Sequence, residues 1–296
     1  MRYRTFGKTG WEVSEVSLGG AYLMGSDPDR AEDNASEVVR KALELGINYI
    51  DTAPLYGNSE VVLGHALEGI SDSFHIATKV GFDPEDFDYK KDSVLWSLER
   101  SITRLRIERI SVAQIHEVNK GGWERITEPC GTLEGLLEAQ KRGMCEKIGI
   151  TGRSIPLLTR LVETGEFDSV LFYYDYHPCC QLAAEELIPA ASELSMGIVA
   201  ATVLAGGLFG HEEKRQEALD RMAEDARSKA ERVLRRLHQE DGTLAQSAFR
   251  YVLADSRMST IASGAGTIDE LADVAQASEM GPLARDVIEG IHQSQE

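Results

Sequence analysis

Short apolar runs and segments of helical periodicity alternate along most of the chain. Each run is rich in Val and Ile and is followed by a turn, and then by a stretch whose apolar residues recur every three or four positions, as at 35, 38, 39, 42 and 45. Such a run predicts a buried strand, and the stretch after it predicts an amphipathic helix. The eight predicted strands are residues 16–18, 47–50, 75–79, 112–115, 147–150, 170–173, 198–201 and 259–262.

Eight strands that alternate with helices require parallel pairing, because each crossover helix returns the chain to the same end of the sheet. Eight such units close into a barrel more readily than they form an open sheet. No predicted strand is followed by the Gly-x-Gly-x-x-Gly loop of doubly wound dinucleotide-binding folds. The predicted fold class is therefore α/β, a (β/α)8 barrel of the TIM type. Since no composition break divides the chain, residues 1–296 are predicted to form one barrel domain.

Segments outside the eight units predict additions to this barrel. Residues 2–13 alternate around a GKTG turn, which predicts a β-hairpin that plugs one end. Residues 204–216 are irregular and residues 217–239 are highly charged, which predicts a loop and one helix inserted after the seventh strand. Two helix starts are also predicted: one at Ser59 for a helix that ends near Gly69, and a capping box formed by Thr267 and Glu270.

The functional residues of such a barrel lie at the C-terminal ends of its strands. Asp51 follows the second predicted strand, Lys79 ends the third, and His116 ends the fourth. Asp51 and Lys79 come from neighbouring strands, so their side chains can pair, and Tyr56 can fold back from the loop between them. The polar residues at the remaining strand ends are Thr151, Tyr173, Asp175 and Ser263.

These first four residues have complementary chemistry. A free tyrosine has a pKa of about 10, which is too high for efficient proton transfer at neutral pH. A lysine cation about 4 Å away would lower that pKa by roughly one to three units. Asp51 would keep Lys79 charged and oriented, and His116 would polarise the same substrate oxygen. Together they are predicted to donate and accept the proton of a carbonyl/alcohol pair.

Composition removes several classes of partner. The chain has 31 Lys and Arg against 49 Asp and Glu, a formal net charge of −18, which disfavours nucleic acids and anionic membranes. No apolar stretch approaches the roughly 20 residues of a membrane span, and the first residues lack the apolar core of a signal peptide. The charged residues 212–236 are predicted to be a solvated helix face.

The cysteines and histidines predict no metal site. The four cysteines contain no C-x-x-C motif, and no histidine has partners at metal-ligand spacing. The adjacent Cys179 and Cys180 are predicted to be reduced thiols rather than a strained disulfide. These features predict a cytoplasmic location, where thiols stay reduced.

Several separated motifs make the chain resemble a known family. They are RTFGKTG (4–10), GINYIDTAPLYGNSE (46–60), ATKV (77–80), QIH (114–116) and KIGIT (147–151). The chain is similar to the aldo-keto reductases, and that family's catalytic tetrad would fall on Asp51, Tyr56, Lys79 and His116. The resemblance implies reversible hydride transfer between a nicotinamide cofactor and a carbonyl carbon. Tyr56 would be the general acid in reduction and the general base in oxidation.

The resemblance also implies a cofactor site, with departures from the family's pattern. Thr151-Gly152 replaces the usual Ser-Asn, and Ala201 stands where an aromatic residue normally stacks on the nicotinamide. Tyr173 replaces a Gln or Asn and is a candidate for the missing stacking surface. The implied cofactor-binding residues are Gly20, Ala21, Thr151, Gly152, Tyr173, Thr202, Leu204, Gly206, Ser263, Gly264, Gly266 and Glu270. Gly20 and Ala21 could equally form only a tight turn.

The choice of dinucleotide is predicted from residues 263–270. NADP-preferring members of the family carry basic residues there, whereas this segment contains no Lys or Arg. The Glu270 carboxylate would repel a 2′-phosphate but could accept a hydrogen bond from a free ribose hydroxyl. The predicted cofactor is therefore NAD, with NADP as the alternative.

The departures are similar to the branch of the family that oxidises sugars such as L-galactose, L-fucose and D-threo-aldoses at C1, and to related pyridoxal dehydrogenases. This likeness implies that the substrate is a small sugar, oxidised from the hemiacetal to a lactone. Candidate substrate-binding residues are Tyr22, Phe82 and Trp123, in loops after the first, third and fourth strands. The chain is expected to be a monomer or a small homo-oligomer.

Other interpretations of these residues stay open. The barrel could carry an NAD(P)H-dependent reductase of aldehydes or ketones, including keto-sugars. It could instead carry a Schiff-base lyase with Lys79 as the nucleophile, or a non-catalytic cofactor-binding subunit. Asp51 and Lys79 alone could be a structural ion pair, and Tyr22 and Trp123 could be simple loop packing.

Overall fold

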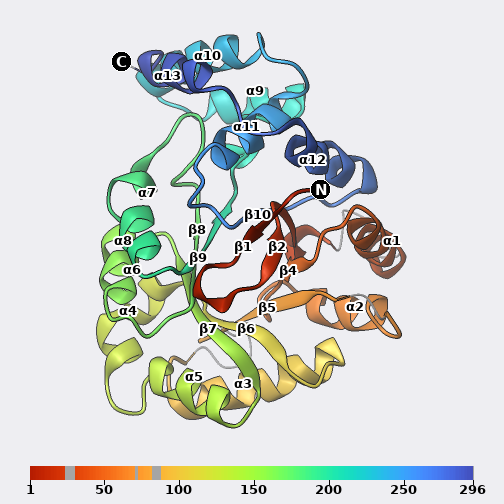
Figure 1. Ribbon diagram of the computed structural model, residues 1–296, viewed down its shortest axis with the longest axis vertical. Helices are drawn as coiled ribbons and strands as arrows, with labels where there is room; N and C mark the ends of the chain where they lie inside the picture. The colour runs from red at the N-terminus through yellow and green to blue at the C-terminus, as the bar shows by residue number, and fades with distance from the viewer. Residues whose placement is uncertain (24–30, 71–72, 82–87, 296) are drawn as a thin grey trace.

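A closed barrel of eight parallel strands forms the centre of the computed structural model (Figure 1). The structure describes residues 1–23, 31–70, 73–81 and 88–295. The barrel order is β10-β3-β4-β5-β6-β7-β8-β9, and β10 closes the ring by pairing with both β3 and β9. The strands are β3 (Val16–Gly19), β4 (Tyr49–Asp51), β5 (His75–Val80), β6 (Ile110–Ile115), β7 (Cys145–Gly152), β8 (Ser169–Tyr173), β9 (Gly197–Ala201) and β10 (Thr260–Ser263). All eight predicted strands and the fold class are thus confirmed.

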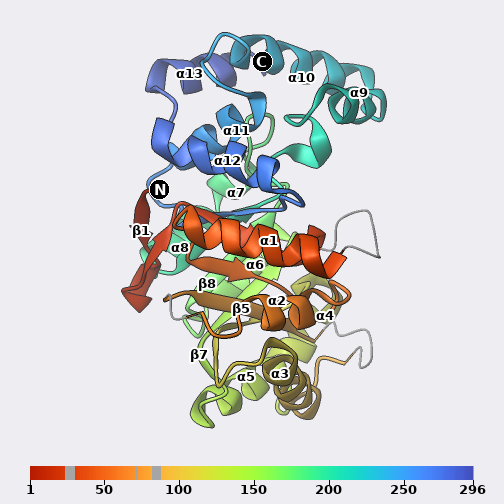
Figure 2. The ribbon, with the colours of Figure 1, turned by 90° about the vertical axis from the view of Figure 1, so that its right-hand side faces the viewer.

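Helices surround the barrel because each crossover buries an apolar face against the strands (Figures 1 and 2). Those before β9 are α1 (Ala31–Glu44), α2 (Ser59–Ala66), α3 (Lys91–Leu105), α4 (Val118–Thr127), α5 (Thr132–Lys141), α6 (Ile155–Val162), α7 (Leu182–Glu185) and α8 (Leu187–Glu193). Those after β9 are α9 (Glu212–Asp220), α10 (Glu224–Leu237), α11 (Leu244–Leu253), α12 (Ile268–Met280) and α13 (Arg285–Gln293). Short 3-10 turns, η1 (Gly7–Thr9), η2 (Gly20–Tyr22) and η4 (Ala205–Gly207), complete the described elements.

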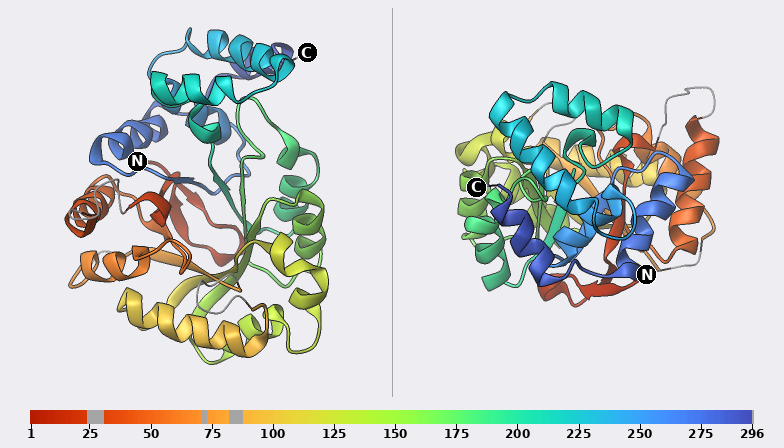
Figure 3. Two further views of the ribbon diagram at one scale, coloured as in Figure 1. Left: turned by 180° about the vertical axis from the view of Figure 1, so that it is seen from behind. Right: turned by 90° about the horizontal axis from the view of Figure 1, so that it is seen from above.

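The charged insertion after β9 contains two helices, so the prediction of a single helix over residues 217–239 is wrong. The first helix, α9, begins at Glu212 and the second, α10, begins at Glu224. Ala223 between them has an extended backbone, and Glu224 and Asp225 favour a new helix N-terminus because they oppose the positive end of the helix dipole. Figures 2 and 3 show α9, α10 and α13 forming a layer beyond the barrel.

The N-terminal hairpin, β1 (Tyr3–Thr5) with β2 (Glu12–Ser14), closes one end of the barrel as predicted. Phe6 and Val13 are fully buried in the apolar cluster inside the barrel, together with Tyr49. Any side chain at Gly197, the first residue of β9, would collide with the Phe6 ring, since a Cβ there would lie 2.5 Å from it. The plug therefore fills the N-terminal ends of the strands.

A buried carboxylate joins the hairpin to the last barrel helix. Glu15 accepts hydrogen bonds from Arg4 Nε at 2.7 Å and from the Ser278 hydroxyl at 2.8 Å. Arg4 also donates to the backbone carbonyls of Leu253 and Met258. Figure 1 shows the N-terminus beside α12, where these contacts form.

The predicted helix starts are partly confirmed. The Thr267 hydroxyl accepts from the backbone N–H of Glu270 at 3.2 Å, but the Glu270 carboxylate accepts from Gly266 N–H at 3.0 Å instead of completing the capping box. Helix α2 begins at Ser59 and ends at Ala66, and Gly69 forms a left-handed turn just beyond it.

In the part of the chain that the structure describes, no helix has the length and apolar character needed to cross a membrane. All four cysteines are free thiols. No cluster of three potential metal ligands occurs among the same residues.

Candidate active site

Asp51 and Lys79 form a buried ion pair inside the C-terminal end of the barrel. Asp51 is the last residue of β4, and Lys79 lies on β5 beside it. The Lys79 ammonium donates to Asp51 Oδ2 at 2.5 Å and to the carbonyl oxygen of Thr52 at 2.9 Å. The other Asp51 oxygen accepts from the Gln114 amide at 2.8 Å, so both carboxylate oxygens are held. Lys79 is only 1% exposed, which keeps its charge away from water.

Tyr56 lies in the loop between β4 and α2. Hydrogen bonds within this loop and behind it hold the loop in place. The hydroxyls of Thr52 and Ser59 meet at 2.9 Å across the base of the loop. The next residue, Glu60, is buried and accepts from Thr78 on β5 and from Arg104 on α3. These contacts fix the start of α2 and with it the loop that carries the Tyr56 phenol.

The loop brings the Tyr56 ring to Lys79 and His116. Lys79 Nζ lies 4.7 Å from the centroid of the Tyr56 ring, and the His116 ring meets Tyr56 edge-on at a centroid distance of 5.9 Å. His116 follows β6, and its N–H donates to the Val80 carbonyl at 2.9 Å, which extends the pairing between β5 and β6. The four residues predicted to form the catalytic group are therefore adjacent in space.

The Tyr89 hydroxyl fixes the turn that follows His116. It donates to the carbonyl oxygens of His116 at 2.8 Å and of Glu117 at 3.1 Å. The Tyr89 ring is buried against Gly81 and Gly121, where a Cβ at either position would come within 2.7 Å of it. The two glycines thus make room for the ring that holds the backbone turn after His116.

Burial and charge set the proton affinities of these groups. Burial raises the pKa of Tyr56; Lys79 opposes this effect, and Asp51 and Glu117 reinforce it. Burial opposes the charge of Lys79, but Asp51 and Tyr56 outweigh it and raise the pKa of the ammonium. Burial, and then the Lys79 cation, hold the pKa of His116 well below its usual range, so its imidazole is neutral. At rest, Tyr56 is therefore a neutral phenol, Lys79 an ammonium ion and His116 a neutral imidazole.

A cavity of about 1180 Å³ opens above these residues. It is lined by Asp51 and Tyr56, by the ends of β3, β9 and β10, and by parts of α9 and α12. Lys79 and His116 are buried beneath the lining. The cavity lies at the C-terminal ends of the strands, opposite the hairpin plug, as predicted for the functional site of this barrel.

The comparisons with known proteins agree with this geometry. The model of the aldo/keto reductase family matches residues 15–296. This chain belongs to the aldo-keto reductase family. It is 27% identical to L-galactose dehydrogenase of Arabidopsis thaliana, over 96% of this chain and 90% of the relative. It is 30% identical to D-arabinose 1-dehydrogenase of Saccharomyces cerevisiae, over 82% and 76% respectively.

A solved structure shares the whole fold. The holo form of the aldo-keto reductase AKR11C1 from Bacillus halodurans is 26% identical, with a TM-score of 0.84, covering 100% of this chain and 97% of that one. The protein is thus an oxidoreductase, of a family that uses nicotinamide cofactors and acts on small sugar or carbonyl substrates.

Many of the predicted cofactor residues of this aldo-keto reductase line the cavity. They are Ala21, Thr202, Leu204, Gly206, Ser263, Gly264 and Glu270. The remaining ones, which are absent from its lining, are Gly20, Thr151, Gly152, Tyr173 and Gly266.

Two of the absent residues are glycines with a packing role. A Cβ at Gly20 would lie 2.6 Å from the Ser59 hydroxyl, and one at Gly152 would lie 2.9 Å from Val118. Their small size therefore serves close contacts behind the cavity.

The three predicted substrate-binding residues differ in where they lie relative to the cavity. Tyr22 lines the cavity and is 67% exposed, with its ring against Gly264 of the β10 end. Trp123 lies on α4, outside the lining, and the Arg160 guanidinium covers its ring at 3.6 Å. A role for Trp123 in substrate binding stays a prediction. Phe82 lies outside the described residues.

Sequence reasoning missed parts of the lining. Tyr174 lines the cavity in place of its neighbour Tyr173, and its backbone is left-handed, with φ of 68°. Lys214, Arg215 and Arg221 also line it, although their segment was predicted to be a solvated face. The signal was present, because these cations closely follow a glycine-rich loop, the arrangement expected where a phosphate binds.

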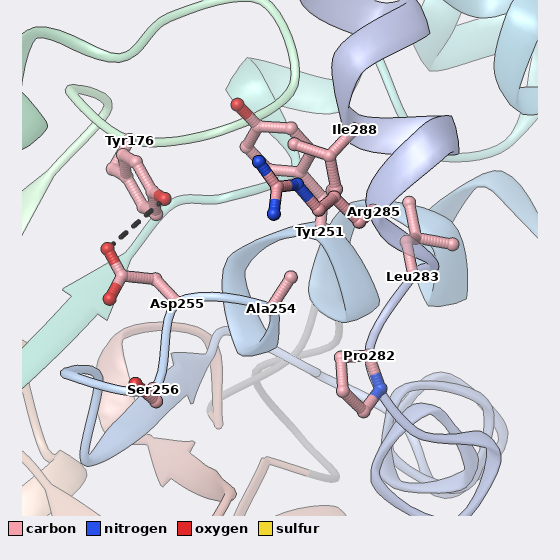
Figure 4. A pocket seen from close by; sticks show the side chains of 9 residues that line it. All are labelled: Tyr176, Tyr251, Ala254, Asp255, Ser256, Pro282, Leu283, Arg285 and Ile288. Atoms are coloured by element: carbon pink, nitrogen blue, oxygen red, sulfur yellow. Dashed lines mark hydrogen bonds between the residues drawn. The ribbon is translucent and has the colours of Figure 1, made fainter.

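A second cavity, of about 500 Å³, lies apart from the tetrad (Figure 4). It is formed by the loop after β8, the end of α11 and the start of α13. Tyr176 and Tyr251 supply its aromatic surface, and the Tyr176 hydroxyl lies 3.4 Å from Asp255. None of the predicted site residues lines it.

Proposed function

We propose that this aldo-keto reductase uses NAD to oxidise an aldose at C1 to a lactone. The observation that carries the proposal is the group formed by Tyr56, Lys79, Asp51 and His116 at the base of the large cavity. The sugar dehydrogenases among the relatives support the substrate class.

The residues that line the cavity fit a nicotinamide dinucleotide. Its volume suits a ligand larger than most drug-sized molecules. Thr202, Leu204 and Gly206 line the cavity in the segment that follows β9, while Lys214 and Arg215 could pair with a pyrophosphate. When bound, the cofactor accepts or supplies the hydride.

The four polar residues have distinct roles in this proposal. In oxidation Tyr56 removes the proton from the anomeric hydroxyl, and in reduction it returns that proton to the carbonyl oxygen. The Lys79 cation stabilises the phenolate that forms. Asp51, held by Gln114, keeps Lys79 charged and fixed. The neutral His116 orients the substrate oxygen by a hydrogen bond.

The preference for NAD rests on the acidic end of the cavity. Asp269, Glu270 and Asp273, all on α12, line it together. Their charges would repel the 2′-phosphate of NADP, while a carboxylate there can accept a hydrogen bond from a ribose hydroxyl.

Reduction of aldehydes or ketones is the second candidate function. It is favoured by the raised pKa of Tyr56, which burial keeps protonated and ready to donate. A Schiff-base lyase fits less well, because Lys79 is buried, protonated and bonded to Asp51, whereas a nucleophilic lysine must be neutral.

A substrate and cofactor screen tests the proposal. Purified protein is mixed with L-galactose, L-fucose or D-arabinose and NAD or NADP, and with aldehydes and the reduced cofactors. The proposal expects the largest kcat/KM for an aldose with NAD. Turnover confined to aldehyde reduction would favour the second candidate, and cofactor binding without any turnover would favour a non-catalytic subunit.

A further inference from the structure

A glutamine amide inside the barrel contacts the catalytic group without belonging to it. Gln114 lies on β6, in register with Lys79 of β5, and is fully buried. Its Nε2 donates to Asp51 Oδ1 at 2.8 Å, while the Lys79 ammonium donates to Asp51 Oδ2. The Asp51 carboxylate is therefore held between a cation on one oxygen and a neutral amide on the other.

The next strand leaves room for this amide. Gly149 of β7 pairs in register with Gln114, on the side opposite Lys79. A Cβ at Gly149 would lie 3.3 Å from Gln114 Cγ and would collide with the hydroxyl of Ser169 on β8. A side chain at position 149 would therefore crowd the stem of Gln114, and the glycine keeps that stem in place.

Burial of this amide is unfavourable for the stability of the fold. Among the described residues, the buried Gln114 Oε1 has no hydrogen-bond partner. An apolar side chain of similar size, such as methionine, would avoid the cost of an unsatisfied polar atom. Turning the amide over would not help, because its oxygen would then face the Asp51 carboxylate. The hydrogen bond to Asp51 is therefore the contact that accounts for a polar residue at this position.

The contacts continue from Asp51 to the Tyr56 phenol. The Lys79 ammonium bonds both Asp51 and the phenol, and its bond to the phenol lowers the pKa of Tyr56. The negative charge of Asp51 acts in the opposite direction and raises that pKa. An amide that donates to Asp51 offsets part of its negative charge. Asp51 then opposes the Tyr56 phenolate less, although it still binds Lys79.

We propose that Gln114 is a positioning residue for the catalytic group: its amide fixes Asp51 and offsets its charge, so that Lys79 can stabilise the Tyr56 phenolate. Gln114 acts through Asp51 and touches neither substrate nor cofactor in this role. The inference rests on the proposed function, because it assumes that Tyr56 exchanges a proton with the substrate. It applies to both directions of the reaction, since the phenolate forms in reduction and is consumed in oxidation.

Gln114→Met removes the amide and keeps the unbranched stem. We expect kcat to fall by about 10- to 100-fold, the value of one hydrogen bond to a charged group, both for D-arabinose with NAD and for glyceraldehyde with NADH. KM should stay within about 3-fold, because the lost contact acts on the transition state and not on the substrate. The midpoint of thermal unfolding should stay within about 4 °C of wild type, since the variant loses a hydrogen bond but also an unsatisfied oxygen.

Gln114→Glu makes the hydrogen bond depend on pH, which a merely structural role would not do. Asp51 and Lys79 face this position. Because two carboxyl groups in one site resist double ionisation, the pKa of the introduced carboxyl should be raised. While protonated it can donate to Asp51 as the amide does, so kcat for glyceraldehyde reduction at about pH 5 should lie within about 5-fold of wild type. Above that pKa the repulsion should lower kcat by about 10-fold or more, where the wild-type profile stays level.

Ser169→Ala is the matched control. The Ser169 side chain lies against Gly149, as that of Gln114 does, and its buried hydroxyl has no hydrogen-bond partner among the described residues. Its removal should change neither kcat nor the pH profile. Cofactor titration and thermal unfolding of each variant check that cofactor binding and the fold persist.

Several outcomes would overturn the inference. Wild-type kcat in Gln114→Met, or a Gln114→Glu profile parallel to that of wild type, would show that the hydrogen bond to Asp51 does not matter for catalysis. A fall of more than about 10 °C in the unfolding midpoint of Gln114→Met would show that the amide serves the fold. Wild-type protein that reduces glyceraldehyde but oxidises no aldose would refute the proposed function alone, and the variants would still be compared in reduction. Protein that is inactive in both directions with either dinucleotide would refute both.

Discussion

The Tyr56 phenol is subject to opposing influences. The lysine cation beside it favours the phenolate, as expected from the sequence, but burial of the phenol and the carboxylates of Asp51 and Glu117 outweigh that effect and raise its pKa. The spacing of residues could predict the contact with Lys79 but not the depth at which the loop buries the ring. The raised pKa keeps the phenol protonated at rest, so in the proposed mechanism Tyr56 is a proton donor and becomes a base only when Lys79 stabilises the charge that develops.

Replacing Tyr56 tests its role directly. Tyr56→Phe keeps the ring against His116 and Lys79 but removes the exchangeable proton. We expect turnover to fall by about 10² to 10⁴, the usual range for a positioned acid or base, while cofactor affinity stays within about 3-fold. Steady-state kinetics and a fluorescence titration measure the two quantities. Tyr3→Phe, at an exposed tyrosine of the hairpin, is the matched control, and near-normal turnover in Tyr56→Phe would rule the phenol out.

The same pKa predicts opposite pH profiles for the two directions. Lys79 and His116 lie against the Tyr56 ring, and the charges of Asp51 and Glu117 also act on the phenol. The net result of burial and these charges is a raised pKa. Oxidation needs the deprotonated form, so its kcat/KM should rise by about tenfold per pH unit through the alkaline range. Reduction needs the protonated form and should stay level until the pH approaches that pKa. A profile for oxidation that is already level at neutral pH would contradict the raised pKa.

At the scale of elements, the regular parts of the chain were predictable and the junctions were not. Strands and helices repeat a pattern of apolar residues because each element must bury an apolar face in the core. The barrel can therefore be predicted from this periodicity. Where the chain leaves a strand, backbone conformation decides which side chain meets the cavity. The left-handed backbone of Tyr174 places it on the lining instead of Tyr173, and the extended Ala223 divides the charged insertion into two helices.

Glu270, near the N-terminus of α12, is the residue that we expect to decide between NAD and NADP. Glu270→Arg replaces a carboxylate at the acidic end of the cavity with a cation that can bind the 2′-phosphate in bidentate fashion. We expect wild-type protein to bind NAD more tightly than NADP, and the variant to improve the affinity for NADP relative to NAD by at least about 10-fold.

Fluorescence titration with both dinucleotides measures that ratio. Glu279→Arg, at the far end of the same helix, makes the same charge change away from the cavity and should leave the ratio unchanged. Tighter binding of NADP by wild-type protein would remove Glu270 as the determinant.

At the scale of the whole molecule, the charge is distributed unevenly around the cavity. The chain carries a net charge of −18, yet Lys214, Arg215 and Arg221 gather on the lining that the insertion supplies. An excess of acidic residues disfavours polyanions as partners, but it does not prevent a local basic wall for one pyrophosphate. Composition alone could not reveal this cluster of cations on the cavity lining. The three residues follow the strand ends only after a loop, so their position depends on how that loop folds. The prediction that residues 1–296 form a single domain stays a prediction.

Glu15 helps to hold the hairpin plug at the opposite end of the barrel. This carboxylate is buried and ties Arg4 of the hairpin to Ser278 of α12, and its removal would leave the Arg4 guanidinium partly buried with only carbonyl partners. Breaking a buried pair on one side usually costs about 3–5 kcal/mol. Because Arg4 keeps those carbonyl contacts, we expect Glu15→Ala to lower the free energy of unfolding by about 3 kcal/mol.

Urea unfolding measures this loss, with Glu12→Ala on the exposed face of the same hairpin as the control. The tetrad lies at the other end of the strands, so the folded variant should keep its kcat/KM within about 3-fold at moderate temperature. A stability unchanged from wild type would show that the hairpin is held by the apolar packing of Phe6 and Val13 alone. A large loss of activity in the folded state would show instead that the plug and the catalytic end are coupled through the barrel.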